Sequence, residues 1–422
     1  MKRRQRRVVR VILILGLLII ISGVAFGGWL TRPDNTNGSS LSAPGENTPA
    51  PTETPSPEPA PPPEPTPTEP EPEPEPPPPP VNLVPNTGVI EHLFFHEVIA
   101  WPELAFNGNH QQRGFDNYMV TVSEFNKILQ SLYDNNFILV DLNDVWSEYT
   151  NADGLQRMRR NTLMLPEGKK PLVLSFDDLN FYAYMQGYGF MDRYIIGDDG
   201  EIWAIGTDPQ GNTVISQDLT AVTILDRFVR ENPGFSHNGA KGAIALTGYE
   251  GILGYRTQTN RHDNSAEFQR NRRMEIARVR PVVERLKETG WYFASHSWGH
   301  INLERASLTA VQNDAIRWMD EVGSLVGETK IFIYPFGSRL DGGDVWQTGP
   351  AFRFYHDLGF RIFLSVGREP FVRIKPDIAA VVGDRMAVDG ISLRTRRDRF
   401  MRFYDAAEVF DHRRPAEFGR NW

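Results

Sequence analysis

The chain has 422 residues, which is long enough for one large domain or two ordinary ones. Its formal net charge is −8, and it has no dense basic patch with interleaved aromatic residues, which argues against a nucleic-acid-binding protein. It contains no cysteine, so a disulfide framework and a lipid-modified cysteine are both excluded.

The N-terminal residues have the pattern of a membrane anchor. Residues 1–10 form a basic tail with six Lys or Arg, and the next charged residue is Arg32. The apolar segment 11–30 would reach roughly 30 Å as a helix, the thickness of a bilayer core. The positive flank predicts a single-pass membrane protein with a cytoplasmic N-terminus and an extracytoplasmic body. A cleaved signal peptide is the alternative, but the long apolar run lacks a clear A-x-A site, which favours an uncleaved signal-anchor.

A proline-rich stretch follows the apolar segment. Nineteen of the 32 prolines lie between Ala43 and Val81, where glutamate is the only charged residue. Such a composition cannot bury enough apolar surface to offset the entropy of ordering. We therefore predict a disordered, extended Pro/Glu-rich linker over residues 31–85, which would let the body reach into a cell wall. Residues 86–422 remain as one domain, which we expect to be monomeric.

In this body, strand-like and helix-like patterns alternate. An N-cap at Ser123, followed by apolar residues at helical spacing, predicts a helix there. Buried strands are expected at 93–95, 137–140, 172–176, 243–246, 291–294, 331–333 and 361–364, and further helices at 224–229, 268–288, 308–326 and 352–358. This alternation predicts parallel strands with crossover helices, in either a barrel or a doubly wound sheet. Turn signals between residues 181 and 218 predict a hairpin insertion.

Three short polar segments follow predicted strands directly. They are LSFDDLN at 174–180, ASHSWGH at 294–300 and IYPFGS at 333–338. Ligands bind at the carboxyl ends of the strands in parallel α/β folds, so we expect the three segments to meet at one mouth. Trp298 and Phe336 would line the groove there.

The residue types in these segments indicate a metal site. His296 and His300 are four residues apart, and we expect them on one side of a helical turn, where they can share a metal ion. One carboxylate of the Asp177–Asp178 pair would complete a ligand set with open positions, and the other could accept a proton from a water molecule. Zinc is the expected metal, and Co²⁺, Ni²⁺ or Mn²⁺ would also fit such a site.

The same segments resemble the motifs of the NodB-homology polysaccharide deacetylases, carbohydrate esterase family 4. The first motif, F-D-D, is matched at residues 176–178, the second, H-[ST]-x-x-H, at 296–300, and the third, P-[YF]-G, at 335–337. The segment LFFHE at 93–97 resembles the start of the exopolysaccharide-deacetylase-like branch. The motifs occur in the order that the family has.

This resemblance implies a fold and a set of roles. The fold would be a distorted (β/α) barrel, with Asp178, His296 and His300 holding the metal. Asp177 would be the catalytic base, and the N–H of Phe336 would form part of the oxyanion hole.

Three departures from the family pattern bear on these roles. Leu179 stands where the family usually has glycine, and Ile-Tyr at 333–334 stands where it has an arginine before the proline. Arg385 is our candidate for the missing cation that orients Asp177. No L-x-H segment occurs near the C-terminus, so we predict His96 as the general acid in place of the family's histidine.

These observations predict a hydrolase that removes N-acetyl groups from an amino-sugar polysaccharide and releases acetate. Peptidoglycan and poly-N-acetylglucosamine are the expected substrates, and the enzyme would face the cell wall from the cell membrane. One alternative is a wall-glycan-binding protein that keeps the fold but has impaired catalysis. Another is a glycoside hydrolase, which would need a further acid beside the aspartate pair.

Overall fold

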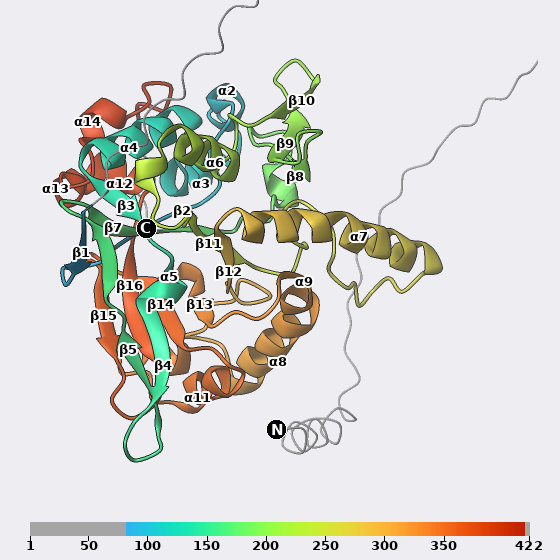
Figure 1. Ribbon diagram of the computed structural model, residues 1–422. Helices are drawn as coiled ribbons and strands as arrows, with labels where there is room; N and C mark the ends of the chain where they lie inside the picture. Colours follow the sequence, from blue (N-terminus) through green and yellow to red (C-terminus); the bar gives the residue numbers. More distant parts are fainter. Residues whose placement is uncertain (1–81, 418–422) are drawn as a thin grey trace, which may run out of the picture. The chain divides into compact units, whose positions relative to one another are not determined.

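The computed structural model describes residues 82–417, and a closed barrel of parallel strands lies at its centre (Figure 1). Each neighbouring pair is parallel, and β7 also pairs with β11, which closes the ring. The (β/α) barrel is therefore confirmed, and a doubly wound sheet is excluded. Around the barrel the strands are β11 (Gly242–Leu246), β12 (Trp291–Ser295), β13 (Ile331–Ile333), β14 (Ile362–Val366), β16 (Val381–Ala387), β2 (Glu91–Phe95) and β7 (Lys170–Asp177).

Alternate residues of the barrel strands belong to two different apolar clusters, as the period of a strand requires. Large residues such as Phe176 and Phe293 join the cluster that contains the apolar faces of the helices. Smaller ones such as Ala245 and Ala294 belong to the second cluster. Arg385 on β16 is fully buried, and its guanidinium reaches Ser175 and Asp177 on β7.

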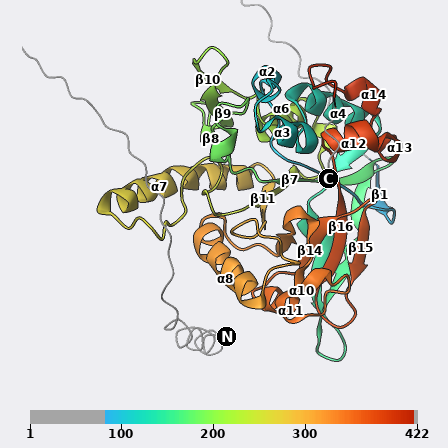
Figure 2. The same ribbon diagram turned by 180° about the vertical axis from the view of Figure 1, so that it is seen from behind.

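Helices cover the outside of the barrel. α4 and α6 lie on one side, and α8 and α11 on another (Figures 1 and 2). The longer helices are α3 (Gln112–Tyr118), α4 (Val122–Asp134), α6 (Ala221–Glu231), α7 (Ala266–Glu288), α8 (Leu308–Trp318), α11 (Pro350–Asp357) and α12 (Gly390–Thr395). The short ones are α2 (Pro102–Ala105), α5 (Leu142–Val145), α9 (Ser324–Val326), α10 (Leu340–Gly343), α13 (Arg397–Phe400) and α14 (Ala406–Val409).

The remaining strands form additions to the barrel. β3 (Phe137–Leu139) pairs with the start of β7, and β15 (Phe371–Ile374) forms an antiparallel pair with β16. β4 (Trp146–Thr150) and β5 (Gln156–Arg160) form a separate hairpin. Residues 181–218, where a hairpin was expected, contain an antiparallel sheet of three strands, β8 (Arg193–Ile196), β9 (Ile202–Thr207) and β10 (Thr213–Ser216).

Two helix predictions need correction. The N-cap of α4 is Thr121 rather than Ser123, because Thr121 and Glu124 form a reciprocal capping box. The helix expected over 308–326 is interrupted by a wide π-turn at Met319–Gly323. This turn carries Glu321, whose carboxylate accepts hydrogen bonds from the hydroxyl of Thr259 and the indole of Trp298.

The predicted tail at 1–10 and signal-anchor at 11–30 lie outside the described residues, as does most of the linker. The C-terminal boundary of the linker at residue 85 is wrong, because β1 (Leu83–Asn86) pairs with β6 (Leu163–Pro166). Within residues 82–417, no helix is both long and apolar enough to span a membrane.

A buried ionic cluster ties the C-terminal segment to the body. The side chain of Arg414 is fully buried, and its guanidinium donates to both carboxylate oxygens of Glu124 on α4 at 2.6 Å. It also donates to the carboxylate of Asp116 on α3 at 2.9 Å. Arg413 next to it is more than half exposed, and within residues 82–417 its ion pair is with Asp411 alone.

This difference in burial predicts different effects on stability. Arg414→Ala would leave Glu124 buried without its cation, whereas Asp116 keeps its pair with Arg394, and we expect the free energy of unfolding to fall by about 3–5 kcal/mol. Arg413→Ala should lower it by about 1 kcal/mol or less, because the guanidinium of Arg413 is exposed and water and the hydroxyl of Thr121 can still hydrogen-bond the carboxylate of Asp411. Guanidinium chloride unfolding of both variants measures the difference. Equal midpoints would show that the cluster does not hold the C-terminal segment.

Candidate active site

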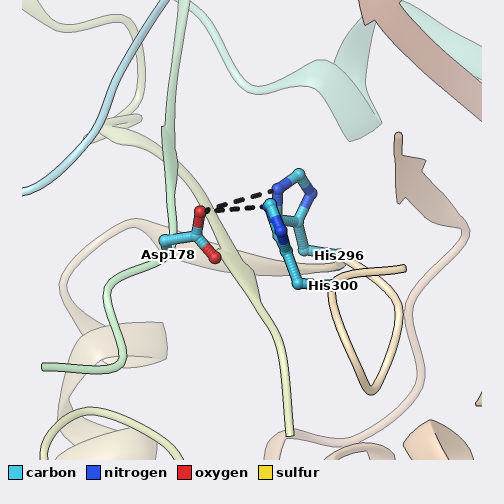
Figure 3. Close-up of side chains that lie close together, drawn as sticks. All are labelled: Asp178, His296 and His300. Atoms are coloured by element: carbon cyan, nitrogen blue, oxygen red, sulfur yellow. Dashed lines mark ion pairs between the residues drawn. The ribbon is translucent and has the colours of Figure 1, made fainter. Parts of the chain in front are cut away.

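The three polar segments meet at the carboxyl ends of the barrel strands β7, β12 and β13. Asp177 is the last residue of β7 and Asp178 follows it, while His296 follows β12 directly. The third segment forms a 3₁₀ turn, Pro335–Gly337, after β13. The carboxylate of Asp178 faces the rings of His296 and His300 (Figure 3).

The distances in this group fit a metal site. Asp178 Oδ2 lies 3.4 Å from His300 Nε2 and 3.9 Å from His296 Nε2, and the three possible ligand atoms all lie within 4.8 Å of one another. Ligand atoms bound to one ion at about 2.1 Å in tetrahedral or octahedral geometry are about 3.0–3.4 Å apart. Asp178 Oδ2 and His300 Nε2 already have this separation, and Asp178 Oδ2 and His296 Nε2 would have to approach by only about half an ångström.

His296 is held in the form that binds a metal. Its Nδ1 donates a hydrogen bond to the carbonyl of Ile333 at 2.9 Å, which leaves the lone pair of Nε2 on the side of Asp178. Burial lowers the pKa of His296 and outweighs the opposite effect of Asp177 and Asp178. The imidazole is therefore neutral near pH 7.

Asp178 has a hydrogen-bond partner that the sequence did not indicate. The hydroxyl of Tyr182 donates to Asp178 Oδ1 at 2.5 Å and also contacts Thr247 Oγ1 at 2.6 Å. Tyr182 is buried and its ring is stacked on that of Tyr249. Its spacing of four residues from Asp178 was visible, but a tyrosine in an aromatic-rich segment is usually a packing residue.

The two histidines approach each other in a loop, and the expected helical turn between them is wrong. Ser297 has a φ of 57° and His300 a φ of 48°, which no helix contains. Asp314 on α8 fixes this loop, because its carboxylate accepts hydrogen bonds from the N–H groups of Trp298 and Gly299 at 2.7 Å. The H-x-x-x-H spacing therefore works here through a tight loop.

Asp177 forms a buried ion pair with Arg385. Two guanidinium nitrogens of Arg385 donate to the two carboxylate oxygens at 2.8 and 2.9 Å, and one of them also donates to Ser175 Oγ. Burial alone would raise the pKa of Asp177, but Arg385 and then His296 outweigh it and lower this pKa to about 2. Asp177 is therefore ionised and fixed, 4.0 Å from His296 Nε2.

A cavity of about 560 Å³ opens beside these groups. Its lining includes His96, the two aspartates, both histidines and Phe336. His96 Nδ1 donates to the carbonyl of Tyr118, so its Nε2 is the nitrogen that can gain or lose a proton. The side chain of Phe336 is exposed and its φ is 57°, and among residues 82–417 no backbone hydrogen bond uses its N–H.

The departures from the family motifs have structural explanations. Leu179 is fully buried in the apolar core. Asn180 next to it donates to the carbonyls of Thr247 and Gly251, which fixes the loop after β11. Trp298 is not among the residues that line the cavity, contrary to expectation. Its ring is stacked under the guanidinium of Arg317 instead.

The sequence matches no family model and no curated protein. Solved structures similar to it include the deacetylase PplD of Streptococcus pyogenes in complex with acetate, at 14% identity and a TM-score of 0.39, over 73% of this chain and 94% of that one. A polysaccharide deacetylase of Bacillus anthracis matches at 11% and 0.38, over 72% and 65% of the two chains. One of Bacillus cereus matches at 11% and 0.37, over 73% and 66%. All three are named as deacetylases.

Proposed function

We propose that this protein removes N-acetyl groups from an amino-sugar polysaccharide by metal-dependent hydrolysis and releases acetate. The observation that carries the proposal is the position of Asp178, His296 and His300 around one point, next to a fixed and ionised Asp177. A binding protein without catalysis would have no use for this arrangement.

Asp178, His296 and His300 would hold the metal. A site with one carboxylate and two imidazoles suits Zn²⁺ first, and Co²⁺, Ni²⁺ or Mn²⁺ as alternatives. When bound, the metal polarises the acetyl carbonyl and lowers the pKa of a water molecule.

Asp177 is our candidate for the catalytic base. Its carboxylate takes the proton of the attacking water, and Arg385 keeps both oxygens in place while the proton moves. Because Arg385 also stabilises the ionised form, Asp177 is ready to accept a proton at any pH well above 2.

Two further groups complete the reaction. The N–H of Phe336 donates a hydrogen bond to the oxyanion that develops on the acetyl carbonyl. His96 donates a proton from Nε2 to the leaving sugar nitrogen, while its Nδ1–H stays on the Tyr118 carbonyl. The products are acetate and a free amino sugar.

We further propose that the enzyme acts at the cell wall as a monomer. The basic tail at 1–10, the apolar segment at 11–30 and the Pro/Glu-rich stretch support a membrane-anchored body that faces outward. Peptidoglycan or a poly-N-acetylglucosamine polymer would be the substrate.

Replacing the base tests the reaction. Asp177→Asn should lower acetate release from acetylated glycans by a factor of about 10²–10⁴, because an amide cannot accept the proton of the water. Metal analysis of the same preparation should still find one ion. Asp198→Asn, in an exposed turn of the insertion, is the control. Wild-type turnover by the Asp177 variant would disprove its role, and reducing ends without acetate would indicate a glycoside hydrolase.

Tyr182 offers a test of the metal site that is independent of turnover. Tyr182→Phe removes the hydrogen bond to Asp178 but keeps the ring, so we expect the affinity for Zn²⁺ to fall by about 10–100-fold. Competition with a chromogenic chelator measures this affinity. Tyr184→Phe is the matched control, because Tyr184 stacks on Tyr182 without a hydrogen bond to Asp178. Equal affinities for Zn²⁺ in the wild type, Tyr182→Phe and Tyr184→Phe would contradict a metal site at Asp178.

Arg385 should set the acidic limit of activity. It lowers the pKa of Asp177 against the effect of burial, so Arg385→Met should raise that pKa. A protonated carboxyl cannot act as base, and the acidic limb of the kcat/KM profile should therefore move to higher pH. Arg385→Lys keeps a positive charge, so its acidic limb should lie between those of the wild type and Arg385→Met. If the limb stays in place in both variants, Arg385 does not control the base.

A further inference from the structure

The cavity has two chemically different ends. The candidate metal ligands and Asp177 form one end, at the carboxyl ends of β7 and β12. Most of the remaining wall is apolar or aromatic and comes from β2, α3 and α12 with their adjoining residues, among them Phe94, Phe115, Met119 and Ile391. Tyr184, from the 3₁₀ turn Ala183–Met185, also lines it. One cationic side chain, Arg396, lies in this wall.

Arg396 follows directly after α12 and is half-buried. Among residues 82–417, it takes part in no ion pair. Arg394, two residues before it, pairs with Asp116 at 2.7 Å. Arg396 therefore differs from Arg394, which is already paired with a carboxylate of the protein.

Arg396 lies close enough to Asp389 to lower the pKa of its carboxyl group. This carboxylate is already used, because Oδ1 accepts a hydrogen bond from the N–H of Ser392 at 2.6 Å and caps α12. Burial raises the pKa of Asp389, and Arg396 lowers it only in part. Asp389 therefore gives Arg396 a nearby charge without a direct contact.

We infer that Arg396 binds a carboxylate on the substrate, and that the cavity selects an N-acetyl amino sugar which carries a carboxylic acid. A guanidinium in an apolar wall without an ion pair is a ready partner for a planar carboxylate, which it can bind through two parallel hydrogen bonds. The inference rests on the proposed function and narrows its substrate. It favours a glycan with a carboxylated side chain, such as a lactyl ether, over a neutral poly-N-acetylglucosamine.

The test compares substrates that differ in one charge. The purified full chain would be assayed for acetate release from a peptide-free tetrasaccharide of N-acetylglucosamine and N-acetylmuramic acid, and from the same compound with its carboxylates converted to methyl amides. A charge-assisted pair predicts a kcat/KM for the acid at least about 10-fold higher than for the amide. Arg396→Gln should bring this ratio close to one, and Arg396→Lys should leave an intermediate ratio. Arg397→Gln, at the exposed neighbouring arginine, should keep the wild-type ratio.

Titration calorimetry of both tetrasaccharides against the Asp177→Asn variant, with and without Arg396→Gln, gives the same comparison without turnover. A wild-type ratio near one, or a ratio that persists in Arg396→Gln, would overturn the inference while acetate release still supports the deacetylase. If no glycan releases acetate but binding prefers the acid through Arg396, the proposed function is wrong and the carboxylate site stands.

Discussion

The ion pair between Arg385 and Asp177 is the contact on which the site depends. Taking both charges out of water is costly, and only a bidentate geometry with further hydrogen bonds offsets it. The barrel supplies that geometry, because β16 and β7 are separated only by β2. With Asp177 fixed at the end of β7, the chain turns at Asp178, whose φ is 63°, toward the two histidines. Two adjacent carboxylates thereby acquire different partners and different roles.

Two loops at the site are then each fixed by one buried polar side chain. Asp314 holds the histidine loop and Asn180 the loop after β11, while Tyr182 holds the carboxylate of Asp178. Side-chain amides and carboxylates bound to backbone groups leave little freedom to a loop that has no regular structure. Such support is what metal ligands need if they are to lie in place before the ion binds.

Much of this could be predicted from sequence, for identifiable reasons. Buried strands followed by Asp-Asp or by histidine mark the carboxyl ends of a parallel sheet, so residues 177–178 and 296–300 were located without a structure. The alternation of elements is the same in a barrel and in an open sheet, so closure between β7 and β11 was not visible. The conformation of the histidine loop was missed because a spacing of four residues also fits a helix. Tyr182 was missed because, in a sequence, a tyrosine that supports a metal ligand cannot be told from one that packs in a core.

The part of the cavity wall that contains Arg396 comes from different elements than the candidate metal ligands do. The ligands follow the barrel strands, whereas Arg396 depends on the position of α12. That helix is tied to α3 through Arg394 and Asp116, and Asp116 in turn shares its carboxylate with Arg414. Under the proposed function, changes in this cluster would alter which sugar fits the cavity without touching the groups that act on the acetyl group. The candidate catalytic groups and Arg396 thus come from separate parts of one domain, and both line the same cavity.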